Sequence, residues 1–420
     1  MSTLRRLEID RLGQFGDGLS GSGRDTVAIA GTLAGETVEA RLDGRQGDLV
    51  AVLAPSPDRQ VPPCPQAGDC GGCQLQHMRP DAEDAFKRAR LETALKLAGV
   101  VHPPLAATRF GGQRRRVAFT ARHDHEGTAL GFNARRSHRI VAPGGCTVVR
   151  PEILGALTVL KAVAAITAKA DGTTRLAVLA TRTGLDVAVS DARKGALEAR
   201  QKLMRLALDA GFARLTLDGE IIAQHEPPVL DFGRAPVTLP PSGFAQASLE
   251  AELAMADLVL EGIGKAKRVA DFFAGSGTFA LRIAERAKVH AVEADRSALF
   301  ALEAGWKAAG GLKPLTTERR DLFKVPPLAK ELALYDAVVF DPPRAGAEAL
   351  SRAIAKSGVR RVVAVSCEPE TLARDLAILT QGDYRIDAIT PVDQFRHAAH
   401  IEAVAVLTST AQRPKGSRSR

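Results

Sequence analysis

The alternation of hydrophobic and polar positions divides the 420-residue chain into parts with different periods. Over the first 56 residues, short apolar stretches between glycine turns predict strands at 4–11, 26–30, 36–42 and 49–54, a spacing typical of a small OB-type β-barrel. Prolines within 55–65 then mark a linker. A helical period follows over 81–98, ended by Gly99, with apolar positions that include Ala85, Ala89, Leu91, Leu95 and Leu97.

Beyond this helix the pattern is mixed at first and then regular. Residues from about 106 to 232 combine strands and helices, with strands expected at 175–180 and 186–190, and we interpret them as a central domain. From about residue 240, strands and helices alternate, which predicts a parallel, doubly wound α/β sheet. Its expected strands are Arg268–Phe273, Val289–Glu293, Leu315–Arg319, Ala337–Phe340, Arg361–Ser366, Arg385–Ile389 and His400–Leu407.

These periods predict a division into a β-barrel at 1–56, a mixed α+β central domain at 57–235, an α/β domain at 236–410 and a basic tail at 411–420 that we expect to be disordered. The composition, 45% apolar and 25% charged, is that of an ordinary globular protein. Neither a long uncharged apolar stretch nor a signal peptide is evident. We therefore expect a cytoplasmic protein without a membrane partner, whose cysteines stay reduced.

The net charge of +9 is concentrated in two places. Residues 109–139 carry eight arginines against Asp124 and Glu126, and residues 412–420 carry four cations and no acid. The barrel has no basic excess. Clustered arginines indicate a face that binds nucleic-acid phosphates, although a solvated surface with a loose tail would give the same pattern.

Four of the five cysteines have the spacing of metal ligands. Cys64, Cys70 and Cys73 form Cys-x5-Cys-x2-Cys, and Cys146 is remote from them. Three close thiolates with a distant fourth suit an iron–sulfur cluster, whereas zinc, the alternative, usually takes paired Cys-x2-Cys knuckles or histidines. A cluster joining Cys73 to Cys146 would brace the arginine-rich segment between them, which we expect to face RNA.

Glycines and acids follow the first strands of the α/β domain. The turn Asp271-Phe-Phe-Ala-Gly275-Ser-Gly277 lets a ligand approach the backbone, but it lacks the third glycine of the dinucleotide fingerprint. Glu293 ends the next strand, where it can accept two ribose hydroxyls, and Asp321 can meet an adenine edge. This set favours S-adenosylmethionine (SAM) over NAD, the alternative being a tight turn with incidental acids.

A proline-stiffened acid follows the fourth strand, in Asp341-Pro-Pro-Arg344. The prolines would fix the carboxylate beside a methyl donor. Arg344 stands where methyltransferases that act on amino groups need an aromatic residue to stack the base. The sequence therefore argues against N-methylation of adenine, and a purely structural turn is the alternative.

The fifth cysteine, Cys367, lies between an apolar strand and a helix start, where a thiolate is favoured; an inert buried thiol is the alternative. A thiolate that adds to C6 of uracil turns C5 into a nucleophile toward a methyl group. A base must afterwards remove the C5 proton. Glu402 begins a half-buried strand and is a candidate, unless it is a solvated strand-end residue. His397 and His400 could also serve as the base, although we expect each to be an ordinary surface or core histidine.

The segments Asp-Pro-Pro-Arg-Ala-Gly, Ser-Cys-Glu-Pro-Glu-Thr-Leu-Ala-Arg-Asp and His-Ile-Glu resemble those of the RNA uracil-C5 methyltransferases, the TrmA/RlmD family, and the resemblance covers nearly the whole chain. It implies a class I SAM-dependent, Rossmann-like methyltransferase domain and an N-terminal TRAM domain. It makes Cys367 the nucleophile and Glu402 the proton acceptor. It assigns a 4Fe-4S cluster to Cys64, Cys70, Cys73 and Cys146, and SAM binding to Gln246, Phe273, Thr278, Glu293, Asp321 and Asp341.

The resemblance also implies an RNA partner, most directly 23S ribosomal RNA, and a monomeric enzyme. Transfer RNA is the alternative substrate, and a non-catalytic RNA-binding or redox-sensing protein is the alternative outside enzymes. The chain departs from the family pattern at Thr278 and Trp306, where asparagine is common, and in Phe-Ala-Gln-Ala-Ser (244–248), which replaces Phe-Phe-Gln-Val-Asn. These departures concern SAM contacts rather than the reaction.

Overall fold

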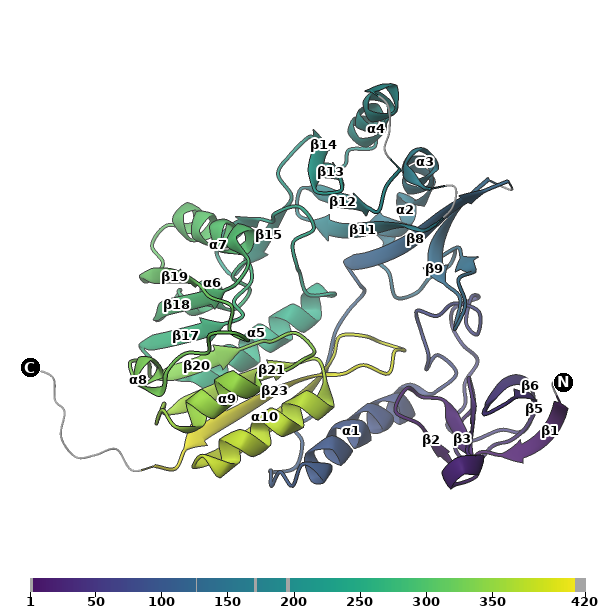
Figure 1. The fold of residues 1–420 in the computed structure, drawn as a ribbon, viewed down its shortest axis with the longest axis horizontal. Coiled ribbons are helices and arrows are strands. Elements are labelled where there is room, and N and C mark those ends of the chain that lie inside the picture. The colour runs from purple at the N-terminus through teal and green to yellow at the C-terminus, as the bar shows by residue number, and fades with distance from the viewer. Residues whose placement is uncertain (1–2, 126, 170–171, 194–196, 412–420) are drawn as a thin grey trace, which may run out of the picture.

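The computed structural model describes residues 3–125, 127–169, 172–193 and 197–411 (Figure 1). The described chain forms a six-stranded, a seven-stranded, a two-stranded and an eight-stranded sheet. The basic tail expected at 411–420 lies outside the described residues from 412 onward, as does Glu126. No helix in the described ranges is long and apolar enough to cross a membrane.

The N-terminal sheet has the order β1-β5-β6-β4-β3-β2. Its two edge strands, β1 and β2, are consecutive in the chain and separated by two residues, so the sheet must curl until its edges lie close together. This gives the expected barrel form, with Ile9, Ile29, Val38 and Ala40 buried inside. The strands are β1 (Thr3–Glu8), β2 (Arg11–Leu12), β3 (Gly18–Ser20), β4 (Val27–Ile29), β5 (Thr37–Asp43) and β6 (Gln46–Ala54), with a 3-10 turn at Gly23–Asp25.

The helix expected at 81–98 is α1 (Pro80–Leu97), but the face that it buries differs from the prediction. Leu91 and Leu95 are buried as expected, whereas Ala85, Ala89 and Leu97 are exposed. The buried face begins instead with two charged residues, Glu83 and Lys87, which the apolar pattern did not include. The helix packs beside α10 (Pro369–Gln381) of the C-terminal domain (Figure 1).

The central domain is built on the seven-stranded sheet in the order β10-β9-β8-β11-β12-β13-β14, covered by three helices. All its neighbouring strands are antiparallel except β12 and β13. The strands are β8 (Arg116–Asp124), β9 (Gly127–Asn133), β10 (Ile140–Val141), β11 (Thr174–Thr181), β12 (Gly184–Ser190), β13 (Arg214–Leu217) and β14 (Glu220–Gln224), and the helices α2 (Pro151–Gly155), α3 (Leu157–Thr167) and α4 (Leu197–Asp209).

The C-terminal sheet has the order β19-β18-β17-β20-β21-β23-β22-β7, and its first five strands are parallel. The expected α/β sheet is thus present, with an antiparallel pair, β23 and β22, beside β21. Its strands are β17 (Arg268–Phe272), β18 (Lys288–Glu293), β19 (Leu315–Arg319), β20 (Ala337–Phe340), β21 (Arg361–Ser366), β22 (Tyr384–Asp393) and β23 (Glu402–Ser409), with β7 (Arg109–Phe110) added from the middle of the chain.

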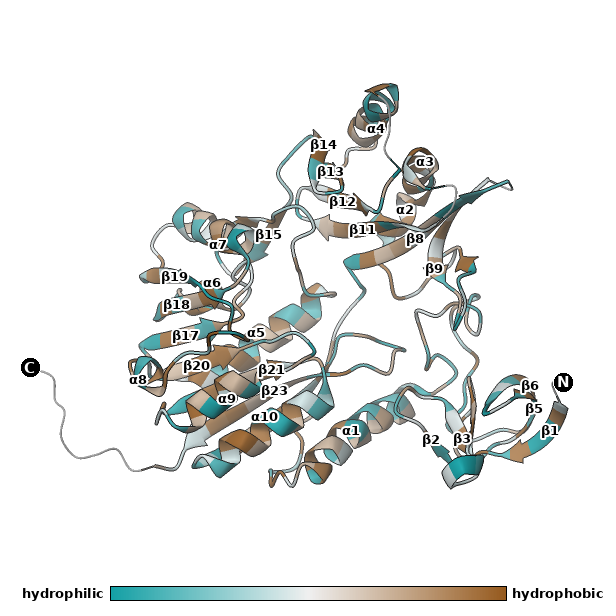
Figure 2. Cartoon of the chain, in the orientation of Figure 1, coloured by the Kyte–Doolittle hydropathy of each residue, from teal (hydrophilic) through white to brown (hydrophobic). Residues whose placement is uncertain are grey.

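Helices cover both faces of this sheet, because successive strand residues point to opposite sides. Val269 and Val339 belong to one core, whereas Ala270 and Val338 belong to the other. Several of the covering helices carry hydrophobic and hydrophilic residues on different sides (Figure 2). They are α5 (Leu249–Ile263), α6 (Ala280–Ile283), α7 (Arg296–Ala309), α8 (Ala329–Leu332), α9 (Glu348–Ala355) and α10 (Pro369–Gln381).

Two segments tie the central part to the C-terminal sheet. Strand β7 pairs with the end of β22, and the hairpin of β15 (Val229–Phe232) and β16 (Ala235–Thr238) shares a core with α5 and α7. The boundary expected at residue 236 falls inside β16. The hairpin packs with the C-terminal core, which suggests a domain start before residue 229.

Candidate active site

A cavity of about 530 Å³ lies at the carboxyl ends of the parallel strands and contains all eight residues predicted for catalysis and SAM binding. Parallel strands bring their carboxyl ends to one edge of the sheet, which is where α/β proteins bind ligands. The structure therefore brings together side chains that are up to 156 positions apart, from residue 246 to residue 402. They are Gln246, Phe273, Thr278, Glu293, Asp321, Asp341, Cys367 and Glu402.

A chain of hydrogen bonds crosses the floor of this cavity. Gln246 Nε2 donates to Asp341 Oδ2 at 3.2 Å, and Gln394 Nε2 donates to Gln246 Oε1 at 3.1 Å. The same Gln394 amide donates to Glu402 Oε1 at 3.0 Å. Gln394, which the sequence analysis did not single out, thus joins the predicted base to a predicted SAM-binding residue.

Asp341 and Glu402, the carboxyl groups at the two ends of this series of hydrogen bonds, are shielded from water, which destabilises their ionised forms. Burial raises the pKa of Glu402 to about 8, and the neighbouring Asp341 contributes to the shift. Burial raises the pKa of Asp341 to about 7. In the ligand-free protein both groups therefore hold a proton for much of the time near neutral pH, because desolvation disfavours the ionised form.

Cys367 follows β21 and lies just before α10, as the sequence predicted, but its thiol is not acidic. Burial, together with the charges of Glu402 and Asp341, raises the pKa of Cys367 to about 12, and Arg344 acts in the opposite direction. The expectation of a favoured thiolate is wrong for the ligand-free protein. The reason is that burial beside two carboxyl groups outweighs the position near a helix start.

The carboxylates of Glu293 and Asp321, two predicted SAM-binding residues, accept hydrogen bonds from backbone N–H groups. Glu293 Oε2 accepts a hydrogen bond from Gly275 N at 3.0 Å, and its Oε1 accepts bonds from the N–H groups of residues 294 and 295. Asp321 Oδ1 accepts from Phe323 N at 3.1 Å. These bonds leave further lone pairs on each carboxylate for a ligand.

Phe273 has a backbone conformation that aromatic residues seldom adopt. Its φ is +61°, and its ring lies 5.5 Å from that of Phe323. Strained residues of this kind cluster at ligand sites. Ser248, one of the departures from the family pattern, has a structural role, because its Oγ accepts from Ala251 N and caps α5. Thr278, another departure, lines the cavity, and its backbone carbonyl accepts from Arg282.

Two residues of the cavity wall were not identified as site residues by the sequence analysis. Arg116, at the start of β8, reaches the cavity from the central sheet, and its guanidinium lies 4.7 Å from the ring centre of Phe244. Burial, together with Arg175 and Arg115, lowers the pKa of Arg116. Both residues lie in segments that the sequence analysis describes, Arg116 in the arginine-rich segment and Phe244 in Phe-Ala-Gln-Ala-Ser. Their position in the cavity that Cys367 also lines depends on how the domains pack.

The four remaining cysteines line one small cavity with Arg114, apart from the active site. The thiols are free, and burial raises the pKa of Cys70 and of Cys73. Within the described residues, no group of three or more Cys, His, Asp or Glu side chains is placed to hold a metal ion. The structure therefore does not show the expected cluster.

The donor set of this cavity nevertheless fits a thiolate-bound group. Nε and Nη2 of Arg114 are buried and have no hydrogen-bond partner. Buried N–H groups without an acceptor are costly, and the charge of Arg114 lowers the pKa of Cys70 and Cys73. Four thiolates would provide a negative counter-charge beside the guanidinium of Arg114.

The arginine-rich segment is largely occupied by contacts inside the protein. Arg135 and Arg136 pair with Asp17 of the barrel, Arg139 pairs with Asp69, and Arg115 pairs with the buried Glu252. Four of its eight arginines therefore join parts of the molecule, and Arg116 lines the cavity. The expectation that the whole segment is one RNA-facing surface is not supported, because intramolecular carboxylates neutralise half of its cations.

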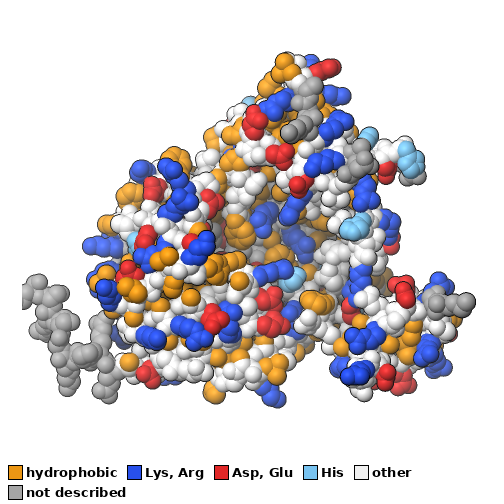
Figure 3. Space-filling model, in the orientation of Figure 1, with side chains coloured by type: hydrophobic (Ala, Val, Ile, Leu, Met, Phe, Trp, Pro, Cys, Tyr) orange, Lys and Arg blue, Asp and Glu red, His pale blue; other side chains and the backbone are white. Residues whose placement is uncertain are grey.

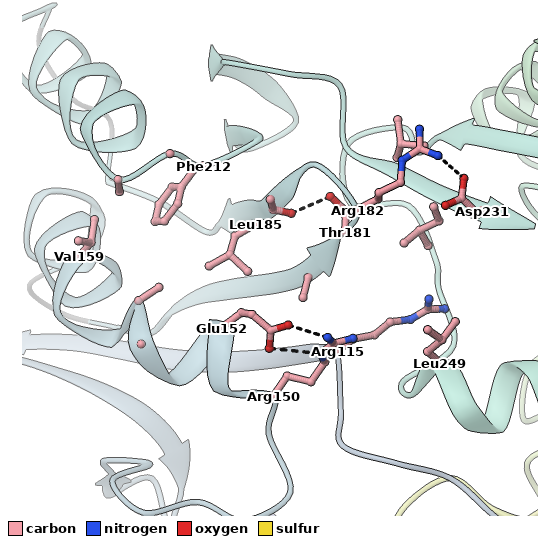
Figure 4. Close-up of a pocket in the computed structure, with 18 residues that line it drawn as sticks. Arg115, Arg150, Glu152, Val159, Thr181, Arg182, Leu185, Phe212, Asp231 and Leu249 are labelled. Atoms are coloured by element: carbon pink, nitrogen blue, oxygen red, sulfur yellow. Dashed lines mark hydrogen bonds and ion pairs between the residues drawn. The ribbon is translucent and has the colours of Figure 1, made fainter.

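A second large cavity, of about 650 Å³, lies between the central and C-terminal parts and contains none of the predicted residues (Figure 4). Two of its arginines are paired, Arg150 with Glu152 and Arg182 with Asp231. Its charges are therefore largely neutralised, and we assign it no part in the reaction.

Comparison with known proteins identifies the family. Residues 240–410 match the model of the tRNA (uracil-5-)-methyltransferase family. The chain is 32% identical to the 23S rRNA (uracil(1939)-C(5))-methyltransferase RlmD of Chromohalobacter salexigens, with 99% of this chain and 92% of the relative covered. The chain belongs to the RNA uracil-C5 methyltransferase family. The present chain is also 48% identical to an RNA methyltransferase of Brucella melitensis, over 97% of this chain and 98% of the relative.

A solved structure shows the same fold. It is that of the tRNA (uracil-54, C5)-methyltransferase of Pyrococcus abyssi in complex with S-adenosyl-L-homocysteine, with a TM-score of 0.72 and 21% identity, covering 96% of this chain and 99% of the other. The class I fold predicted from the sequence is thereby confirmed. The protein is a SAM-dependent RNA uracil-C5 methyltransferase.

Proposed function

We propose that this methyltransferase forms 5-methyluridine in 23S ribosomal RNA through a covalent bond between Cys367 and C6 of the target uracil. The observation that carries the proposal is that Cys367 and Glu402 open onto the same cavity as the predicted SAM-binding residues. The ribosomal substrate is supported by the match to the Chromohalobacter salexigens enzyme along nearly the whole chain. Transfer RNA is the second candidate, because the family model and the Pyrococcus abyssi structure carry that name.

The proposed chemistry needs a nucleophile and a base in turn. The Cys367 thiolate bonds to C6, and the electron pair of the C5–C6 double bond moves toward O4 as an enolate. SAM, when bound, supplies a methyl group made electrophilic by its sulfonium. After C5 takes this methyl group, Glu402 removes the C5 proton, the double bond forms again, and the Cys367 sulfur leaves with the electrons of its bond to C6.

The raised pKa values suggest how the nucleophile is restrained. In the ligand-free cavity the pKa of Cys367 is about 12, chiefly through burial, so the thiol is neutral. A sulfonium charge nearby would favour both the thiolate and the Glu402 carboxylate, since an opposite charge within a few ångströms stabilises the ionised form. Reactivity would then arise when the methyl donor is present.

The uracil would have to leave its stack to reach Cys367. Space-filling atoms show Lys and Arg side chains around a hollow on the face of the molecule seen in Figure 3. Arg344 is exposed at the rim, and Arg116 lies inside the cavity. These cations are suited to the phosphates on either side of a flipped nucleotide.

We propose that SAM is held by Gln246, Phe273, Thr278, Glu293, Asp321 and Asp341. The support is their common cavity, the backbone hydrogen bonds that fix Glu293, and the strained backbone of Phe273. We also propose that Cys64, Cys70, Cys73 and Cys146 hold a 4Fe-4S cluster, supported by their shared cavity and by the two nitrogens of Arg114 that have no hydrogen-bond partner. Action as a cytoplasmic monomer, and the domain boundaries, stay predictions.

The covalent step is tested with RNA that contains 5-fluorouracil. Fluorine at C5 blocks proton removal, so with SAM the enzyme should form an RNA adduct that survives a denaturing gel. Cys367→Ala should form none, and Glu402→Gln should accumulate the adduct with natural RNA. A wild-type enzyme that forms no adduct with any cellular RNA would contradict the proposal. Mapping 5-methyluridine in ribosomal and transfer RNA of a deletion strain then decides between the two substrates.

A further inference from the structure

The segment that precedes the predicted base Glu402 lies between two strands and has no regular structure of its own. It runs from Gln394, after the end of β22, to Ile401, before Glu402 begins β23, and we call residues 394–401 the base loop. Gln394, Phe395 and His400 of this loop line the active-site cavity. The residue at its centre, His397, has a φ of +63°. A strained, irregular loop keeps one geometry when its surroundings impose it.

Helix α1 contacts the base loop with charged side chains from its buried face. Lys87 Nζ donates to Asp393 Oδ1 and Oδ2 at 2.8 and 2.9 Å, and to Phe395 O at 3.2 Å. Lys87 also donates to Glu83 Oε1 at 2.7 Å, one helical turn earlier. Lys87 has no exposed surface, so each of its three protons has a partner inside the protein.

Glu83 holds the strained centre of the loop. His397 N donates to Glu83 Oε1 at 2.6 Å, and His397 Nδ1 lies 3.0 Å from Glu83 Oε2. Burial alone would raise the pKa of Glu83, but the hydrogen bond from His397 and the charge of Lys87 outweigh it and lower the pKa to about 2. Arg90, about two turns after Glu83 along α1, donates to Ala399 O.

A second segment holds the loop from the opposite side. Gln74 N and Leu75 N donate to His397 O at 2.7 and 2.9 Å. Arg114 lies over the ring of Phe395, 5.5 Å from its centre. The base loop is therefore fixed along its length by residues that are about 300 positions away in the chain.

We propose that Lys87 and Glu83 are positioning residues for the methylation reaction, which hold the base loop so that Gln394 orients the Glu402 carboxylate toward the target uracil. This inference rests on the proposed role of Glu402. Buried ion pairs add little net stability because of the cost of removing both charges from water. Their value here is geometric, since Asp393, which Lys87 binds, adjoins Gln394, and Gln394 contacts Glu402.

The test replaces Lys87 with an uncharged residue of similar length. With natural RNA and SAM, Lys87→Met should lower kcat by about 10- to 100-fold, as expected for a misplaced reacting group. Thiol addition and methyl transfer would continue while proton removal slows, so the covalent RNA–enzyme adduct should rise during turnover. The KM for SAM should change much less than kcat, because the described hydrogen bonds of Gln394 reach Gln246 alone among the six proposed SAM-binding residues.

Lys96→Met is the matched control, since Lys96 is an exposed lysine of the same helix. It should leave kcat and adduct level unchanged. Unchanged kcat in Lys87→Met, or lowered kcat without adduct, would overturn the proposal. If Lys87→Met does not fold, Glu83→Gln, which keeps an acceptor for His397, is measured by the same two readouts and decides in its place.

Glu402→Gln is run in parallel to separate the two proposals. An adduct with Glu402→Gln but none with Lys87→Met would overturn the positioning role and leave the base assignment standing. No adduct with Glu402→Gln, together with full turnover, would overturn the base assignment and the positioning role with it.

Discussion

At the scale of single residues, the cavity imposes ionisation states that the free side chains would not have. Glu402 is buried and the nearby Asp341 is half-buried, and desolvation raises the pKa of both. Gln394 contacts Glu402 through a single amide hydrogen bond. The ionised form of the predicted base is therefore destabilised in the ligand-free enzyme. Active sites commonly carry such a cost in stability.

This cost predicts a stability that depends on pH. The ordinary pKa of a glutamate is 4.5, and that of folded Glu402 is about 8. Between these values the folded protein keeps a proton that the unfolded chain has lost, so the contribution of Glu402 to stability falls as pH rises from about 4.5 to about 8. Glu402→Gln should therefore stabilise the ligand-free enzyme by about 2 to 4 kcal/mol at pH 8.5 and little at pH 5.

Urea denaturation of both proteins at the two pH values measures this difference. Glu92→Gln, on the exposed face of α1, serves as the control and should show no such dependence on pH. If Glu402→Gln increased the stability equally at pH 5 and pH 8.5, ionisation of Glu402 would not destabilise the folded enzyme, and the prediction would be wrong.

At the scale of elements, the turn between β17 and α6 uses its two glycines for different purposes. A Cβ at Gly277, with φ of +101°, would lie 2.8 Å from Leu281 Cδ1 and 3.0 Å from Leu302 Cγ. A Cβ at Gly275, with φ of +54°, would meet nothing within 4 Å. Gly277 therefore allows the helices to pack closely, whereas Gly275 supplies the backbone conformation that brings its N–H to Glu293.

Alanine substitutions should separate these purposes. Gly277→Ala combines backbone strain with overpacking and should destabilise the enzyme by about 2 to 4 kcal/mol. Gly275→Ala carries the strain alone and should cost about 1 kcal/mol. Urea denaturation gives both values, and titration calorimetry with SAM shows the effect on affinity. Equal destabilisation by the two substitutions would contradict the packing role of Gly277.

At the scale of the whole molecule, the active site lies where separate parts of the chain meet. The C-terminal sheet supplies Cys367 and Glu402, the central sheet supplies Arg116, and α1 holds the base loop. The cysteine-lined cavity is linked to the same loop, because Arg114 lies on Phe395 and the segment after Cys73 binds His397 O. A group bound by the cysteines would therefore brace the catalytic loop from outside the α/β domain.

Metal analysis tests this arrangement. Enzyme purified without oxygen should contain about four iron and four sulfide per chain, the content of one 4Fe-4S cluster. Cys146→Ser should lose most of the iron and lower Tm, because a remote ligand closes a long loop. Cys367→Ser is the matched control and should keep full iron content. One zinc per chain, or no metal at all, would contradict the cluster.

Local patterns in the sequence determined most of the elements and the residues at their ends. The strands at Leu315–Arg319, Ala337–Phe340 and Arg361–Ser366 occur as predicted. The last two are short, nearly continuous apolar runs between turns, which is typical of the buried strands of a parallel sheet. The eight candidate site residues could be found because parallel strands gather their carboxyl ends at one edge.

Only the tertiary structure decided which charges are free and which are buried. Glu83 and Lys87 have the i, i+4 spacing of an ion pair on an exposed helix face. In the structure both are buried, and Lys87 binds Asp393, which is 306 positions away in the chain. Arg135 and Arg136 have the composition of an RNA-binding face, yet Asp17 neutralises them. The acidity of Cys367 likewise depends on neighbours from other strands. Desolvation and charge act through space, so residues distant in sequence determine them.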